Sequence, residues 1–281
     1  MPATDALGQT FAAAGMEARI ASLVPSLTET LFALGLRQQI VARTGFCVHP
    51  RAEVRAIPKV GGTKDVHLDA LRALHPTHVL VNIDENTRGT VEALRTFVPQ
   101  VIVTHPQSPE DNLDLFDLLG AAFGNVQGVA QRAETFRRNL QAVLNDLHTC
   151  PFVPRKVLYL IWRAPWMTVA RDTYISRSLA VVGWHSLPDA LGGDGLHQPG
   201  SARYPAFDWS ADWLEAMDCV LLSSEPYRFG AAHAAEVRSL LGARGLSPEV
   251  RSIPGEWASW YGVRAIDGLR QLAACARSKA T

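Results

Sequence analysis

One amphipathic stretch near the middle of the chain constrains the fold most. From Val126 to about His148, apolar residues recur at alternating steps of four and three, the spacing of one face of an α-helix. Asn125 stands at the N-cap position, and Cys150-Pro151 closes the far end. About 23 residues rising 1.5 Å each give a rod of roughly 35 Å, about the width of a small domain. We interpret it as a spine between two lobes; an ordinary surface helix within one domain is the alternative. The apolar stripe consists of Val129, Ala133, Phe136, Leu140, Val143 and Leu147.

Short helices alternate with apolar strands on both sides of the spine, which predicts an α/β fold. Leu71–Asn82 and Leu214–Ser224 resemble each other, each a short helix leading into an apolar strand. The sequence therefore predicts two Rossmann-like lobes joined by one long backbone helix. Open parallel sheets bind ligands beyond the carboxyl ends of their strands, so a ligand cleft is expected between the lobes. The expected parts are a flexible N-terminal arm (1–18), an N-terminal α/β lobe (19–124), the spine helix (125–150) and a C-terminal α/β lobe (151–281).

Strands and one helix start can be placed more closely. Ser26 and Glu29 have capping-box spacing, which predicts that the first helix begins at Ser26. Strands are expected at Arg19–Val24, Ile40–Arg43, His78–Asn82, Val101–Thr104, Lys156–Ile161, Cys219–Leu222 and Val250–Ile253.

Composition excludes several classes of protein. Lys+Arg and Asp+Glu both total 27, so no basic surplus indicates nucleic-acid binding. The four cysteines lie far apart without a C-x-x-C, which favours neither a zinc site nor a disulfide framework. The N-terminal residues show no signal peptide, and no segment is long enough to span a membrane. A cytoplasmic monomer is expected from the sequence as written, and a periplasmic protein if the start is mis-assigned or trimmed.

Large aromatic residues are distributed unevenly. All seven tryptophans and all five tyrosines lie after residue 158. Several fall in loops expected at strand ends, where large rings suit a flat, partly apolar ligand. For any single ring, packing within the lobe is the alternative.

Chemically reactive groups are sparse. Cys47 and His49 are two apart and could ligate one ion, but metal sites need three or four converging ligands and no second pair appears. No motif for a nucleophile or a phosphate loop occurs. Glu85 and Glu225 follow strands at equivalent places in the two lobes, where they either face a ligand or partner or are solvated loop charges.

The chain resembles a known family in several motifs. These are R-I-A-S-L-V-P-S-L-T-E-T-L-F-A-L-G-L (19–36), I-P-K-V-G-G-T (57–63), L-R-A-L-H-P-T-H-V-L-V (71–81), R-Y-P (203–205), S-S-E-P-Y (223–227) and W-Y-G-V-R (260–264). They are similar to the cobalamin- and siderophore-binding proteins of ABC importers, the class III periplasmic binding proteins or helical-backbone metal receptors. The resemblance implies two Rossmann-like lobes, one joining helix, and a ligand held between the lobes.

The same resemblance implies roles for individual positions. Tyr204 resembles an aromatic position that lines the cobalamin cleft, and Trp166 or Met167 falls near another. Glu256 falls near a carboxylate that contacts the corrin side chains. Thr63 and Asn82 stand where the cobalamin receptor has tryptophans. Asp69 and Asp212 stand near the acidic residues that dock such proteins on permease arginines.

Together these observations predict a non-catalytic binding protein of ABC-importer type. It would have no cofactor of its own and would hold cobalamin, or another metal chelate such as a siderophore or haem. A cytoplasmic enzyme or cofactor carrier that reuses the fold, with Cys47, His49 and Glu225 at its site, is the alternative. The expected ligand contacts are Ser26, Thr28, Phe46, Thr63, Glu85, Trp162, Arg163, Trp166, Tyr204, Glu225, Tyr227, Glu256, Trp257 and Trp260.

Overall fold

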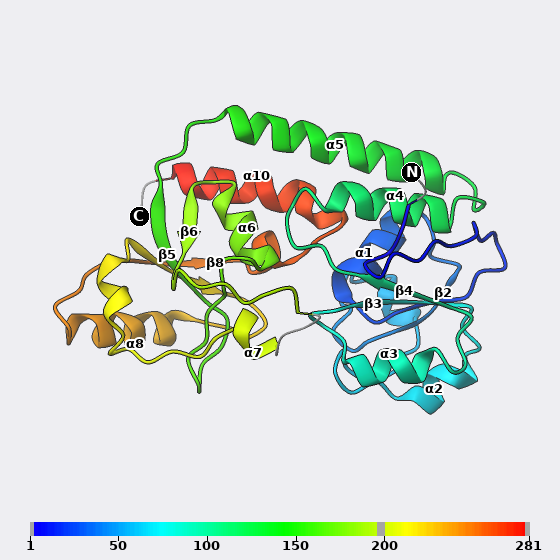
Figure 1. Cartoon of the computed structure of the whole chain (residues 1–281), viewed down its shortest axis with the longest axis horizontal. Coiled ribbons are helices and arrows are strands. Elements are labelled where there is room, and N and C mark those ends of the chain that lie inside the picture. The colour runs from blue at the N-terminus through cyan, green and yellow to red at the C-terminus, as the bar shows by residue number, and fades with distance from the viewer. Residues whose placement is uncertain (1–2, 196–199, 279–281) are drawn as a thin grey trace. The chain divides into compact units, whose positions relative to one another are not determined.

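The computed structural model describes residues 3–195 and 200–278, in which the chain forms two compact units. The first unit comprises Met1–Pro106, Glu110–Gln141 and Tyr261–Ile266. The second comprises Gln107–Pro109, Ala142–Trp260 and Asp267–Thr281. Each unit contains one four-stranded sheet whose strands pair in parallel (Figure 1). The prediction of two parallel-sheet α/β lobes is therefore confirmed.

The first sheet contains β1 (Ile20–Ser22), β2 (Ile40–Arg43), β3 (His78–Asn82) and β4 (Gln100–Thr104), in the order β2-β1-β3-β4. A parallel sheet covered on both faces needs strands that are apolar along their whole length. In β3, all five residues are buried. That explains why these strands appear in the sequence as short continuous apolar runs.

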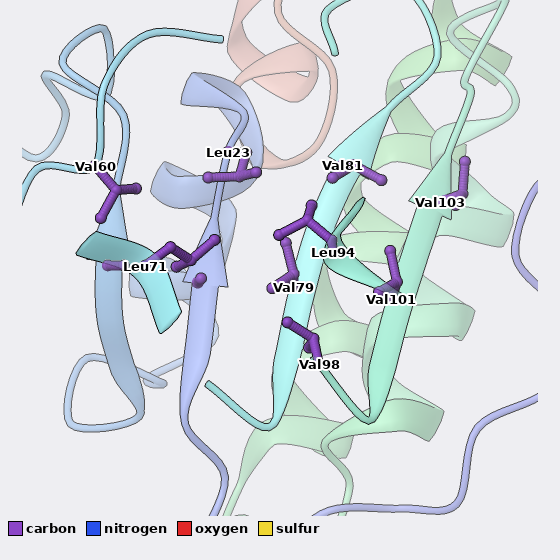
Figure 2. Packing of buried hydrophobic residues seen from close by; sticks show 11 residues of the cluster. Leu23, Val60, Leu71, Val79, Val81, Leu94, Val98, Val101 and Val103 are labelled. Carbon is purple, nitrogen blue, oxygen red and sulfur yellow. The ribbon is translucent and has the colours of Figure 1, made fainter. Parts of the chain in front are cut away.

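Helices of the first unit cover both faces of its sheet. Leu71 and Leu94, from two of these helices, join Val79, Val81 and Val103 in one apolar cluster, which Figure 2 shows from close by. The helical segments of this unit are α1 (Pro25–Ala33), η1 (Val54–Ala56), α2 (Leu68–Ala73), α3 (Arg88–Leu94) and α4 (Asn112–Ala122).

The second sheet contains β5 (Arg155–Leu160), β6 (Trp184–Ser186), β7 (Cys219–Ser223) and β8 (Glu249–Ile253), in the order β6-β5-β7-β8. This is the order of the first sheet, strand for strand. The resemblance between the sequence segments Leu71–Asn82 and Leu214–Ser224 therefore reflects equivalent structure. In the first unit α2 leads into β3, and in the second η2 (Asp212–Ala216) leads into β7. The other helices are α6 (Tyr174–Ala180), α7 (Gly200–Arg203), α8 (Ala231–Gly242), α9 (Glu256–Ser259) and α10 (Val263–Arg277).

The expected spine is α5, which runs from Val129 to Thr149. Its predicted stripe is buried except for Phe136, which is half-buried. The N-cap prediction was wrong, because the helix starts after Gly128, whose φ of +77° places a turn there. The Asn125 side chain instead donates to the carbonyl of Ala13. Among the described residues, no helix has the length and apolarity that a membrane crossing requires.

The expected N-terminal arm makes defined contacts with the first unit. The Asp5 carboxylate accepts hydrogen bonds from the backbone N–H groups of Leu7, Gln9 and Val103. The Ala6 N–H donates to the carbonyl of Val103 at 2.8 Å. Asp5 is buried by these bonds, so the arm is attached to the edge strand β4.

The predicted capping box at Ser26 is absent. Pro25 occupies the first turn of α1, and Val24 is the N-cap residue without a side-chain cap. Proline is favoured at the first helical position because its φ is already helical and no N–H is lost. The Glu29 carboxylate is engaged elsewhere, by the guanidinium of Arg264 at 2.5 Å and 2.7 Å.

Candidate functional site

The strand order places a switch point between the two central strands of each sheet. The third strand lies on the opposite side of the first strand from the second, and sheets of this kind bind ligands beyond the carboxyl ends of the strands at that point. In the first unit these ends are followed by Pro25–Thr28 and Ile83–Asn86. In the second they are followed by Ile161–Trp166 and Ser224–Tyr227. Most of the predicted contact residues therefore lie at the ligand-binding end of their own sheet.

In the second unit, three of the predicted aromatic residues, Trp162, Trp166 and Tyr227, belong to one connected cluster. Trp162 meets Tyr227 edge-on with ring centroids 5.6 Å apart, and Tyr227 contacts Phe229 at 4.8 Å. Trp166 stacks on Phe229 and packs edge-on against Trp209. Such edge-to-face pairs are favourable beyond their buried area, so the rings support one another. Trp162 stands at the outer end of the cluster with 41% of its surface exposed.

Arg163 is tied to the neighbouring helix. Its guanidinium donates two hydrogen bonds to the Glu236 carboxylate, at 2.8 Å and 2.7 Å, and lies 5.7 Å from the centre of the Trp166 ring. Hydrogen bonding from Arg163 lowers the pKa of the Glu236 carboxyl. This bidentate pair fixes the loop after β5 on α8, so Arg163 positions Trp162 and Trp166.

Tyr227 is held by a histidine. The Gly230 N–H donates to His233 Nδ1 at 3.0 Å, which leaves the proton of the neutral ring on Nε2. His233 Nε2 lies 3.1 Å from the Tyr227 hydroxyl and donates to it in that tautomer. The phenol proton of Tyr227 remains available for another acceptor.

The remaining predicted residues of the second unit differ in exposure. Glu225 accepts a hydrogen bond from the Ser259 hydroxyl at 2.6 Å, so this carboxylate braces α9. Trp260 is buried and is not retained as a ligand contact. Tyr204, Glu256 and Trp257 are half-buried.

In the first unit, Asn86 joins three strand-end segments. Its amide Nδ2 donates to the carbonyls of Leu23 at 3.4 Å and Thr63 at 2.9 Å, and its Oδ1 accepts from the Asn82 N–H at 2.9 Å. The adjacent Glu85 accepts from the hydroxyl of Tyr261 at 2.8 Å. This network fixes the loops that carry Thr63 and Glu85.

Two predicted contacts of the first unit, Ser26 and Thr28, are buried in this structure. Thr28 is completely buried, and its hydroxyl lies within hydrogen-bond distance of Ser22 Oγ, the Val24 carbonyl and Cys47 Sγ. Ser26 is also buried. The Thr28 hydroxyl therefore ties α1 to the strand end at Ser22 and to Cys47.

Cys47 is also a packing residue. Its thiol is buried between the hydroxyls of Thr28 and Thr44, at 3.0 Å and 3.2 Å, and burial raises its pKa. A thiol held neutral is a poor nucleophile and a poor metal ligand. Across the described residues, no group of three or more His, Cys, Asp and Glu side chains could hold a metal ion. Nothing here supports the enzyme alternative based on Cys47, His49 and Glu225.

The burial of Cys47 can be tested with a thiol reagent. Cys47 and Cys219 are buried, and burial raises the pKa of the Cys219 thiol to about 12, whereas Cys150 and Cys275 are half-buried. We expect dithionitrobenzoate to react with only two thiols in the native protein at pH 8 and with all four in guanidinium chloride. A double variant, Cys150→Ser with Cys275→Ser, should then show no native reactivity. Rapid native labelling of Cys47 would contradict its assigned packing role.

Two cavities of this structure are lined by residues other than the predicted ligand contacts. One of about 350 Å³ lies in the second unit beside the starts of β5 and β7, lined in part by Arg155, Arg171 and Asp218. Its arginines already pair with Glu249 and Asp189, so we assign it no ligand. Another, of about 250 Å³, lies in the first unit beneath the N-terminal arm.

The two predicted docking acids occupy matching positions. Asp69 is in the first turn of α2 and Asp212 in the first turn of η2, and both are exposed. These elements precede the equivalent strands β3 and β7. The equivalence was visible in the sequence only as the short repeated helix-strand pattern.

Sequence reasoning missed the residues that support the site. Glu236 lies 73 residues from Arg163, and Tyr261 lies 176 residues from Glu85. His233 contacts the Tyr227 hydroxyl from α8. None of these has a local signal.

The chain belongs to the periplasmic binding protein family, since the family model described as "Periplasmic binding protein" matches residues 20–219. Among curated relatives, the vitamin B12-binding protein of Vibrio vulnificus strain YJ016 is 23% identical over 236 residues, which cover 84% of this chain and 77% of that protein. An uncharacterised ABC transporter substrate-binding lipoprotein of Bacillus subtilis strain 168 is 24% identical over 170 residues, 58% of this chain and 53% of that protein.

Solved structures share the fold. The periplasmic vitamin B12-binding protein BtuF of Vibrio cholerae aligns with a TM-score of 0.74 at 17% identity, covering 95% of this chain and 100% of that chain. The periplasmic heme-binding protein RhuT of Roseiflexus sp. RS-1, in apo form, aligns with a TM-score of 0.71 at 21% identity, covering 92% and 97%. The class predicted from the sequence motifs is therefore confirmed.

Proposed function

We propose that this protein is the substrate-binding component of an ABC importer and carries cobalamin or another metal chelate. The observation that carries the proposal is the exposed aromatic end of the second sheet, headed by Trp162, in a chain of the periplasmic binding protein family. Relatives named for vitamin B12 and fold neighbours named for vitamin B12 and heme support this ligand class. The protein needs no cofactor and performs no chemistry on its cargo.

Residues at the strand ends of both units would contact the ligand. Trp162 and Tyr227 would supply a ring and a hydroxyl, with Arg163 keeping their loop in place. Trp166, Tyr204, Glu225, Glu256 and Trp257 would complete the contribution of the second unit. Phe46, Thr63 and Glu85 would contribute from the first. Asn82, the last residue of β3, is buried and is not aromatic. It therefore supplies no ring at the position where the cobalamin receptor has a tryptophan.

An ABC permease is the proposed protein partner. Asp69 and Asp212 are exposed carboxylates at equivalent places of the two units, and each could accept a bidentate hydrogen bond from an arginine. A permease partner places the protein outside the cytoplasmic membrane, as the periplasmic and lipoprotein relatives also favour. The cytoplasmic expectation has no support from these comparisons. We propose that the carrier acts as a monomer.

Fluorescence titration tests the ligand class. We expect saturable quenching of tryptophan fluorescence by cyanocobalamin, cobinamide, haemin or a ferric siderophore, because the seven tryptophans all lie in the second half of the chain. Trp162→Ala should weaken binding of the quenching ligand roughly tenfold, since a large exposed ring loses its contact. Trp184→Phe is the control, because Trp184 is buried in β6 and should leave affinity unchanged. Absence of quenching by every ligand would refute the proposed class.

A further inference from the structure

The outer edge of the first sheet is strand β4, which pairs with β3 on one side. The Thr104 carbonyl accepts from the Ile83 N–H at 3.2 Å, so the backbone groups of Thr104 point toward the β3 side. Because these groups alternate in direction along a strand, Val101 and Val103 direct their N–H and C=O groups outward. An outward row of this kind is a template for pairing with another chain.

The N-terminal arm occupies the outward groups of Val103. The Asp5 carboxylate accepts from the Val103 N–H at 3.1 Å, where the carbonyl of a neighbouring strand would otherwise accept. The Ala6 N–H donates to the Val103 carbonyl at 2.8 Å, as the N–H of such a strand would. Asp5 and Ala6 therefore replace one step of a neighbouring strand without forming a strand themselves.

The same segment is held in a turn. The other oxygen of the Asp5 carboxylate accepts from the N–H groups of Leu7 and Gln9, both at 2.9 Å. The Gly8 N–H donates to the Asp5 carbonyl at 3.0 Å, and Gly8 has a φ of +76°, a backbone conformation that favours glycine. Residues 5–9 therefore make a single pair of bonds with β4 and do not continue along it.

Apolar side chains lie beneath this turn. Leu115 and Leu118 of α4 line the cavity of about 250 Å³ under the arm together with Ala6, and each leucine is only 4% exposed. Without the arm, both leucines would meet water beside an open strand edge. Proteins cover edges of this kind because an apolar surface next to unpaired backbone groups favours association.

We propose that residues 5–9 cover the edge of β4 and prevent it from pairing with a second copy of this chain. In the pairing that they prevent, two β4 strands run antiparallel about a two-fold axis, with Val101 of one copy opposite Val103 of the other. Both residues direct their N–H and C=O groups outward, so the edge is complementary to itself. The inference does not depend on the ligand, and it gives a physical reason for the monomer proposed above.

Deletion of residues 3–9 tests this proposal. We expect the truncated protein to form a dimer, measured by light scattering after gel filtration as a molar mass that approaches twice the monomer value as the concentration rises to about 200 µM. The wild type should stay monomeric over the same range. Adding Val101→Pro to the truncated protein should restore the monomer, because proline removes an outward N–H and is tolerated in an edge strand.

Two point variants give a matched comparison in the untruncated chain. Asp5→Ala removes the acceptor of the Val103 N–H, so we expect amide hydrogen exchange at Val103 to accelerate about tenfold or more, with partial dimerisation at the highest concentration. Glu17→Ala is the control, because Glu17 is also a carboxylate of the arm but accepts from the Gly15 N–H within the arm itself, at 3.0 Å. It should leave both measurements unchanged.

The outcomes are distinct from those of ligand binding. A folded truncated protein that stayed monomeric would overturn the proposal, and so would a dimer that persisted with Val101→Pro or a wild-type dimer. If the deletion prevents folding, the point variants decide, and equal results for Asp5→Ala and Glu17→Ala would overturn it. Failure of every chelate to bind would refute the proposed function and leave this inference standing.

Discussion

Asn86→Leu is expected to lower the free energy of unfolding by about 3 kcal/mol, because it leaves one N–H and two carbonyls without their partner in a buried position. Asn86 is 5% exposed, and its amide serves the strand-end segments after β1, β2 and β3. Leucine has a similar volume and cannot form any of these bonds. Urea denaturation monitored by circular dichroism measures the loss as a lower midpoint with an unchanged slope.

A second substitution at the same position tests the hydrogen-bond argument. Asn86→Asp keeps the oxygen that accepts from the Asn82 N–H, but places another oxygen against the carbonyls of Leu23 and Thr63. It should also destabilise the protein at neutral pH. Asn125→Ala is the matched control, since the exposed Asn125 makes one bond to Ala13 and should cost less than about 1 kcal/mol. Equal effects of Asn86→Leu and Asn125→Ala would show that Asn86 is no more than a surface turn residue.

Most strands could be predicted because a strand buried in a parallel sheet appears in the sequence as a short continuous run of apolar residues. Ile40–Arg43 and His78–Asn82 were expected with the bounds that the structure has. Their centres, Ile40-Val41-Ala42 and Val79-Leu80-Val81, are continuous apolar runs, as expected for strands of a sheet covered on both faces. β6 was missed because Trp184–Ser186 is three residues long and carries a histidine, so it has no apolar run. α10 begins at Val263, where the N–H donates to Thr30 Oγ1, a contact made across 233 residues that no local pattern indicates.

The site was less predictable, since function there depends on contacts that have no local pattern. The aromatic residues at the strand ends were found from their position in loops, which the sequence does record. It does not record that Thr28 faces inward, because the hydroxyl of Thr28 meets Cys47, 19 residues further along the chain, only in the folded unit. It also does not record that Arg163 is occupied by Glu236, because the loop after β5 and helix α8 are 73 residues apart and meet only in the folded second unit. Residue type and loop position therefore indicate candidates, and burial decides which of them can reach a ligand.

Glu249→Gln is expected to lower the free energy of unfolding at pH 7 by about 2 kcal/mol, because it leaves two partly buried arginines without their shared carboxylate. Glu249 accepts from Arg155 at 2.7 Å and from Arg251 at 2.6 Å. Burial alone would raise the pKa of this carboxyl, but the hydrogen bonds from Arg155 and Arg251 outweigh burial and lower it. The folded protein therefore prefers the ionised form more strongly than the unfolded chain does.

The sign of the pH dependence follows from that lowered pKa. The stabilisation by Glu249 is complete above the ordinary carboxyl pKa of the unfolded chain, near 4.5, and is lost as the pH falls through the lower pKa of the folded state. We therefore expect wild type and Glu249→Gln to differ most at neutral pH and to converge in acid, as measured by urea denaturation between pH 7 and pH 3. Glu92→Gln is the control, because the Arg88–Glu92 pair is solvent-exposed and should contribute less than about 0.5 kcal/mol. A constant difference between wild type and Glu249→Gln across this range would mean that the carboxylate contributes by packing and not by its charge.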